Sequence, residues 1–149
     1  MTVVAVWLHV LGVVVWMGGL VYQAHALAPM ARREGAASFA AAAARGRPAA
    51  WAALGLTVLT GLYNVTRLGP LERVMESGAA LVLAGKFGLV LVIVLLAGQR
   101  DFAHLPRLRR ALAAGSDPGP ALTAISWLDR IAILLGVIVI YLGLAISRS

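Results

Sequence analysis

The sequence predicts an all-α membrane protein, a four-helix transmembrane bundle with antiparallel neighbours and both termini on the outer side. Hydrophobic residues make up 61% of the 149 residues and charged residues only 13%, far from the composition of a soluble domain. The apolar residues also gather into long runs, and about 20 apolar residues are enough for a helix to cross the hydrocarbon core. We expect one domain over residues 1–149.

Four apolar runs are expected to span the membrane, namely residues 3–28, 49–65, 78–98 and 127–146. Pro29 should end the first helix. An alanine-rich helix should then lie at the membrane interface and close at Gly46 and Pro48. Gly69 and Pro70 signal a turn before the third span. Residues 99–124 form a longer connection before the fourth span.

The distribution of arginines predicts the orientation. The first and third connections hold four arginines each, whereas the second connection and the C-terminus hold three in all. Because Lys and Arg accumulate in cytoplasmic loops, both chain ends should face outward from the cytoplasmic (inner) membrane. This placement accounts for the net charge of +7 without nucleic acid, so the expected surrounding is the lipid bilayer.

The first span contains polar residues as well as apolar ones. Several of its residues are three or four positions apart and so share one seam of the helix: His9, Gly12, Trp16, Gly19 and Gln23. Glycines on such a seam let a neighbouring helix approach closely. His25 is about 24 Å further along and on another side of the helix, so it cannot share a metal ion with His9 within one chain.

Polar groups from all four spans reach a similar depth on the outer side. The helical rise places His9 about 9 Å and Lys86 about 12 Å below the outer end, where a charge is costly unless it is paired or hydrated. Each residue also has a purely structural interpretation: Lys86 extends outward to water, and His9 only bonds across the bundle. We predict a hydrated pocket formed by His9, Lys86, Asn64 and Tyr141 and closed below by Trp16 and Met17.

An inner layer contains the remaining candidates. His25 and Met30 offer an imidazole and a thioether, which both suit Cu(I). Asp129 is expected to pair with Arg100 or another inner arginine. Trp51 is expected to lie at the membrane interface, like Trp7 and Trp127. The chain has no cysteine, so a metal ion must bind to His, Met, carboxylate or backbone.

Several pieces of the sequence together carry a family resemblance: WLHVLGVVVWMGGLVY followed by LAP, then LTGLYNVTRLG, then LAGKFGLVLVIVLLAGQRD and a later Pro106. In this order and spacing they resemble the copper-resistance protein D (CopD) family domain over nearly the whole chain. The resemblance implies a polytopic inner-membrane domain associated with copper handling. Members of the family are thought to move copper toward the cytoplasm.

A weaker resemblance points to the HemJ-type protoporphyrinogen oxidases, which have a His in the first span and a Lys in the third. His9 and Lys86 match those positions, and the resemblance implies association with haem. The chain departs from that family after WMGGL, where VYQAHALAP replaces its usual Leu-Pro-Arg stretch.

The predicted function is to bind copper or move it across the cytoplasmic membrane, with candidate metal ligands His9, His25 and Met30. One alternative is a haem b-binding redox protein, with the cofactor among His9, Lys86, Asn64, Tyr141 and Trp16. Another is a small accessory subunit of a larger membrane complex, or a homo-oligomer. No hydrolase triad, HExxH motif, phosphate loop or dinucleotide fingerprint is present, so an enzyme is not the expected class.

Overall fold

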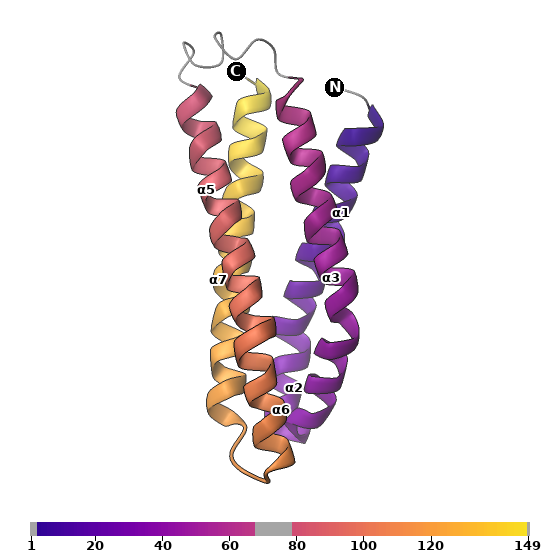
Figure 1. Cartoon of the computed structure of the whole chain (residues 1–149), viewed down its shortest axis with the longest axis vertical. Helices are drawn as coiled ribbons and strands as arrows, with labels where there is room; N and C mark the ends of the chain where they lie inside the picture. Colours follow the sequence, from indigo (N-terminus) through magenta and orange to yellow (C-terminus); the bar gives the residue numbers. More distant parts are fainter. Residues whose placement is uncertain (1–2, 68–78, 149) are drawn as a thin grey trace.

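The computed structural model describes residues 3–67 and 79–148, which form four long helical segments and no strand (Figure 1). The segments consist of α1 (Val3–Tyr22), η1 (Gln23–Leu27) and α2 (Ala28–Glu34); α3 (Ala36–Val65); α5 (Ala79–Gly98), η2 (Gln99–His104) and α6 (Leu105–Ala113); and α7 (Gly119–Arg148). The prediction of an all-α protein is confirmed. The expected turn at Gly69 and Pro70, and Gly78 as the start of the third span, lie outside the described residues.

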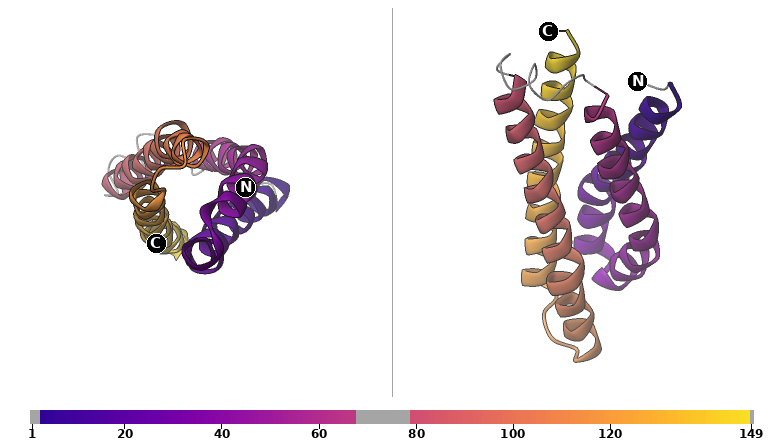
Figure 2. Two further views of the ribbon diagram at one scale, coloured as in Figure 1. Left: turned by 90° about the horizontal axis from the view of Figure 1, so that it is seen from below. Right: turned by 45° about the horizontal axis from the view of Figure 1, so that its top comes forward.

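The four segments surround a common axis (Figure 2). α1 packs mainly on α3 and α5 mainly on α7, and contacts between α1 and α7 join these two pairs. Figure 1 shows both chain ends at the same end of the bundle. At the other end α2 turns into α3 through Gly35, whose φ of +110° lies in the region that favours glycine.

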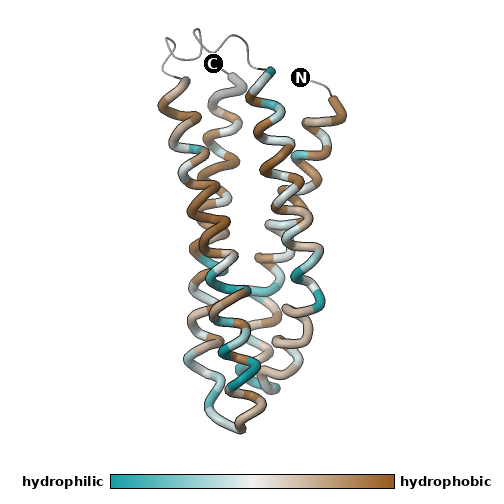
Figure 3. The backbone as a smooth tube through the Cα atoms, viewed as in Figure 1, coloured by the Kyte–Doolittle hydropathy of each residue, from teal (hydrophilic) through white to brown (hydrophobic). Residues whose placement is uncertain are grey.

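Residues of high hydropathy predominate along the part of the bundle nearer the chain ends (Figure 3). Among the described residues, three segments are long and apolar enough to cross a membrane: Val3–Glu34, Ala80–Ala113 and Gly119–Ala145. Their exposed side chains include Val14, Leu91 and Leu134, which suit contact with lipid. α3 is not among them: its 30 residues are long enough, but no stretch of it is as apolar as these three segments.

Pro29 does not end the first helix, contrary to expectation, because it follows a π-helical turn. In η1 the N–H of Ala28 bonds to the carbonyl of Gln23, five residues back, and η2 precedes Pro106 in the same way. A π turn shifts the backbone hydrogen-bond pattern by one residue. Proline has no N–H to donate, and here it follows directly after the turn in which the regular pattern is already interrupted. The first segment therefore continues to Glu34.

The expected interface helix and second span are in fact one helix. Gly46 and Pro48 lie inside α3, which has 30 residues. Alanine has the highest helix propensity, and the alanines of residues 40–44 support the helix on the N-terminal side of the proline. At about 1.5 Å per residue α3 is about 45 Å long, longer than the ~30 Å hydrocarbon core. Its first part therefore projects beyond the apolar region.

The expected connection over residues 99–124 is also mostly helical, and it helps to build an extension of the bundle. Leu105 and Leu108 of α6 are buried there beside Phe39 and Ile125. The arginines of α6 are exposed instead. The extension thus has an apolar core and exposed arginines on α6. Its backbone, the lower part of Figure 3, is more hydrophilic than the part nearer the chain ends.

Candidate functional site

His9 belongs to α1, and its ring packs against α3. Its Nδ1 atom is 2.9 Å from the carbonyl oxygen of Thr57 and 3.1 Å from Oγ1 of Thr60. A carbonyl oxygen only accepts hydrogen bonds, so Nδ1 of the neutral ring carries the proton and donates it. The lone pair is then on Nε2, the arrangement in which an imidazole binds a metal ion.

The sequence of α3 makes room for this ring. Thr57, Thr60 and Gly61 are three or four residues apart and share the face toward α1. A Cβ atom at Gly61 would lie 3.2 Å from Cε1 of His9, so glycine permits the close approach. Asn64 follows on the same face, and its buried Oδ1 has no hydrogen-bond partner among the described residues. This face of α3 is therefore polar, with one acceptor unused.

Lys86 lies on α5, in the other pair of helices. Its Nζ atom packs over Gly143 of α7, where a Cβ atom would be 3.0 Å away. We refer to the following set of candidate residues as the His9 site: His9, Thr57, Thr60, Asn64 and Lys86.

Tyr141 takes no part in this site, so its expected place in the pocket was wrong. Its side chain is 69% exposed. Its position along α7 suits the expected depth, but it is two residues from Gly143 and therefore about 200° around the helix. The rise per residue of a helix determines how deep a residue lies. The direction in which its side chain points depends on the rotation of the helix about its own axis, which the sequence did not provide.

His25 and Met30 lie on the surface and not in the interior. Nδ1 of His25 is 3.2 Å from the carbonyl oxygen of Val21 in its own segment, and Met30 is 48% exposed. Exposed side chains such as these do not form an interior site within one chain. The structure therefore does not support the expected inner metal site at these two residues.

Trp16 and Met17 close the interior further from the chain ends. Both side chains pack over Gly136 of α7, where a Cβ atom would be 2.5 Å from Sδ of Met17 and 3.6 Å from the Trp16 ring. Trp16 is buried. The contact joins α1 to α7 and forms an apolar layer across the bundle, in the place that the sequence suggested.

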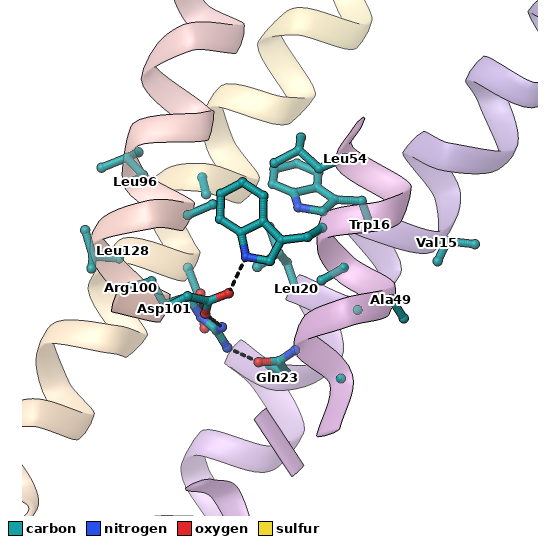
Figure 4. A pocket seen from close by; sticks show the side chains of 17 residues that line it. Val15, Trp16, Leu20, Gln23, Ala49, Leu54, Leu96, Arg100, Asp101 and Leu128 are labelled. Atoms are coloured by element: carbon teal, nitrogen blue, oxygen red, sulfur yellow. Dashed lines mark hydrogen bonds and ion pairs between the residues drawn. The ribbon is translucent and has the colours of Figure 1, made fainter. Parts of the chain in front are cut away.

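A second polar cluster lies outside the predicted site residues and joins all four segments. Arg100 forms ion pairs with Asp101 at 2.5 Å and with Oδ1 of Asp129 at 2.7 Å, and donates a hydrogen bond to Oε1 of Gln23. The indole N–H of Trp51 donates to Oδ2 of Asp101 over 2.8 Å. Figure 4 shows Arg100, Asp101 and Gln23 of this cluster. We refer to these five residues as the Arg100 network.

Both π-helical turns contribute to the network. Gln23 begins η1, and Arg100 and Asp101 belong to η2. π turns reorient the residues that follow and are frequent at functional sites. The predicted pairing of Asp129 with Arg100 is confirmed. Trp51, expected at the membrane interface, donates its hydrogen bond to a residue of another segment. The sequence signal for the network is the charged pair Arg100 and Asp101, which follows an apolar run.

The Arg100 network holds two carboxylates and one guanidinium, so with all three ionised it carries one net negative charge. Asp129 is only 1% exposed. Its ion pair with Arg100 is close but not aligned as a hydrogen bond, and its Oδ2 atom has no hydrogen-bond partner among the described residues. A buried carboxylate in this condition attracts a proton or another cation.

A cavity of about 240 Å³ lies beside the network. It reaches from Trp16, past Leu20 and Leu54, to Arg100 and Asp129 (Figure 4). Since a water molecule takes about 30 Å³ in the liquid, several waters or a hydrated cation fit. The network therefore faces a space that a small ligand can enter.

The part of the chain that the structure describes contains no group of three or more His, Asp or Glu residues that could hold a metal ion. A metal ion at His9 would therefore have one imidazole ligand and no group of further His, Asp or Glu ligands among the described residues. Such a ligand set would suit transient binding better than permanent storage, because structural metal sites have closed ligand sets.

A comparison with protein-family models finds one match, to copper resistance protein D, over residues 40–146. The match covers more than half of the chain. The chain belongs to the CopD family. Comparisons with curated proteins and with solved structures find no match.

The CopD match extends from α3 to α7 and includes Lys86 and four members of the Arg100 network, Trp51, Arg100, Asp101 and Asp129. His9 and Gln23 lie before it. Together with the apolar helices, the match makes this CopD protein a multi-pass membrane protein of copper resistance.

Proposed function

We propose that this CopD protein binds copper at His9 and passes it across the cytoplasmic membrane. The observation that carries the proposal is the hydrogen bond from Nδ1 of His9 to the Thr57 carbonyl oxygen, which leaves Nε2 free as a ligand. Neutral imidazole is a good ligand for copper. The buried Oδ1 of Asn64, which has no hydrogen-bond partner among the described residues, is available as a weaker ligand or as an anchor for water.

The proposed path continues from His9 toward the Arg100 network. The layer of Trp16 and Met17 separates the two, and the 240 Å³ cavity begins at Trp16. A net negative charge in a medium of low dielectric attracts cations. A cation that has passed Trp16 can therefore bind to Asp129, whose Oδ2 atom has no hydrogen-bond partner among the described residues.

The test is copper accumulation in cells with and without the protein. His9→Ala should reduce the protein-dependent change at least about tenfold, since even residues that only orient metal ligands affect affinity 10- to 100-fold. The matched control is His25→Ala, because His25 is exposed and bonded only within its own segment. An unchanged His9 variant at equal expression would refute the proposed route.

We further propose that α3 also crosses the membrane, which gives four spans in all. Neighbouring segments then run antiparallel through the membrane, and both termini face outward. The chain has no cysteine, so single cysteines at the exposed positions Arg67 and Arg45 can be labelled individually. In intact cells a membrane-impermeant maleimide should label Arg67→Cys and not Arg45→Cys. Permeabilised cells, in which both should react, are the control. Labelling of Arg45→Cys in intact cells would reverse the orientation.

Haem b is the alternative ligand. The free Nε2 of His9 suits an axial ligand, and Lys86 supplies a cation for a propionate. An absorbance spectrum of the purified protein separates the two proposals. A Soret band that is lost in His9→Ala would favour haem, whereas a colourless protein with copper-dependent behaviour favours the copper route.

A further inference from the structure

A second cavity, of about 210 Å³, opens between α7 and the junction of η1 and α2. Three arginines line it, and the remaining lining residues are small or uncharged. The lining consists of Ala24, Ala28, Pro29, Arg32, Arg33, Ser126 and Arg130. No carboxylate is among these residues, so the cavity concentrates positive charge.

None of the three arginines forms an ion pair among the residues that the structure describes. The ion pairs found there are both formed by Arg100. Arg130 is held instead over the ring of Trp127, with its Cζ 6.0 Å from the ring centroid. Three like charges beside one cavity repel each other. An anion placed between them would relieve that repulsion and accept hydrogen bonds from the guanidinium groups.

The position of the cavity indicates the source of the anion. It lies just beyond α1, whose 20 residues correspond to about 30 Å, the thickness of the hydrocarbon core. Trp127, beside the cavity, is 59% exposed, and tryptophan favours the headgroup level of a membrane. Exposed apolar residues such as Val21 and Leu134 continue toward the chain ends, where acyl chains would lie.

We infer that this cavity binds the phosphate of an anionic phospholipid, with Arg32, Arg33 and Arg130 around the phosphate and the acyl chains along α1 and α7. Basic pockets between membrane helices on the cytoplasmic side suit such headgroups. Ala24, Ala28 and Pro29 provide a small apolar wall for the glycerol backbone. A zwitterionic lipid also carries a phosphate, but its ammonium group neutralises the negative charge of that phosphate. The arginines should therefore bind an anionic lipid more tightly.

The test measures thermal unfolding of the full chain in detergent with added lipid. Phosphatidylglycerol should raise the unfolding temperature, whereas phosphatidylcholine, and inorganic phosphate at the same concentration, should not. Arg33→Gln/Arg130→Gln should weaken phosphatidylglycerol binding roughly thirtyfold, since each arginine near an anionic lipid contributes about fivefold. The control Arg109→Gln/Arg110→Gln, on the exposed face of α6, removes the same charge away from the cavity and should keep the shift.

Native mass spectrometry provides an independent reading if the double variant unfolds. The wild type and the α6 control should retain bound phosphatidylglycerol, and the single variant Arg32→Gln should retain less. Equal stabilisation by inorganic phosphate would show a site for free anions and overturn the lipid proposal. Equal retention of phosphatidylglycerol in every variant would overturn the assignment to this cavity.

Discussion

Replacement of Arg100 by methionine is expected to lower the free energy of unfolding by about 3–5 kcal/mol, the usual result of removing one partner from a buried ion pair. The variant leaves Asp101 and Asp129 buried without their cation and also removes the hydrogen bond to Gln23. Because these residues come from different segments, the loss should affect the whole bundle.

Thermal or denaturant unfolding of the purified protein in detergent measures this effect. Arg107→Met on α6 is the matched control: Arg107 is exposed, and surface substitutions usually change stability by less than about 0.5 kcal/mol. Adding Asp129→Asn to Arg100→Met should recover part of the loss, because it removes one uncompensated charge. Equal stability of the Arg100 and Arg107 variants would show that the network does not stabilise the fold.

Replacement of Gly12 by alanine is expected to cost about 1–3 kcal/mol, as overpacking of a tight interface does. A Cβ atom at Gly12 would lie 2.5 Å from Oγ1 of Thr57 and 3.0 Å from the carbonyl oxygen of Ala53. The Thr57 side chain can rotate, but the α3 backbone cannot move aside without shifting α1. Because the carbonyl of Thr57 also holds His9, the variant should disturb the His9 site as well.

The control for this prediction is Gly18→Ala in the same helix. A Cβ atom at Gly18 meets no other atom within 4 Å, so the substitution should be neutral or stabilise the helix by up to about 1 kcal/mol. The same unfolding measurement compares the two variants. If Gly12→Ala were as stable as Gly18→Ala, α1 and α3 would not cross as closely as described.

The helices could largely be predicted from the sequence, because apolar runs of about 20 residues leave few alternatives in a membrane. Their ends could not. Pro29 and Pro48 are ordinarily signals to stop a helix, and their effect here depends on a π turn in one case and on a long alanine-rich helix in the other. The result is a bundle that extends beyond its apolar part, where an interface helix and a connection were expected.

The sequence predicted part of the candidate sites for a similar reason. Residue counting gives depth, and it correctly grouped Asp129 with Arg100, which form an ion pair. It could not give the rotation of α7, which turns Tyr141 outward, or show that Trp51 reaches Asp101 from another segment. Those features depend on packing between helices that are far apart in the chain.

The ion pair between Arg100 and Asp129 also bears on how the protein enters its membrane. The two residues belong to helices that leave the ribosome at different times, and a charge in an isolated span costs about 2.5–3.5 kcal/mol. Arg100 has the carboxylate of Asp101 beside it in its own segment, whereas the charge of Asp129 is compensated only when both helices are present. The hairpin from α5 to α7 is therefore the unit that the insertion machinery must release into the bilayer together.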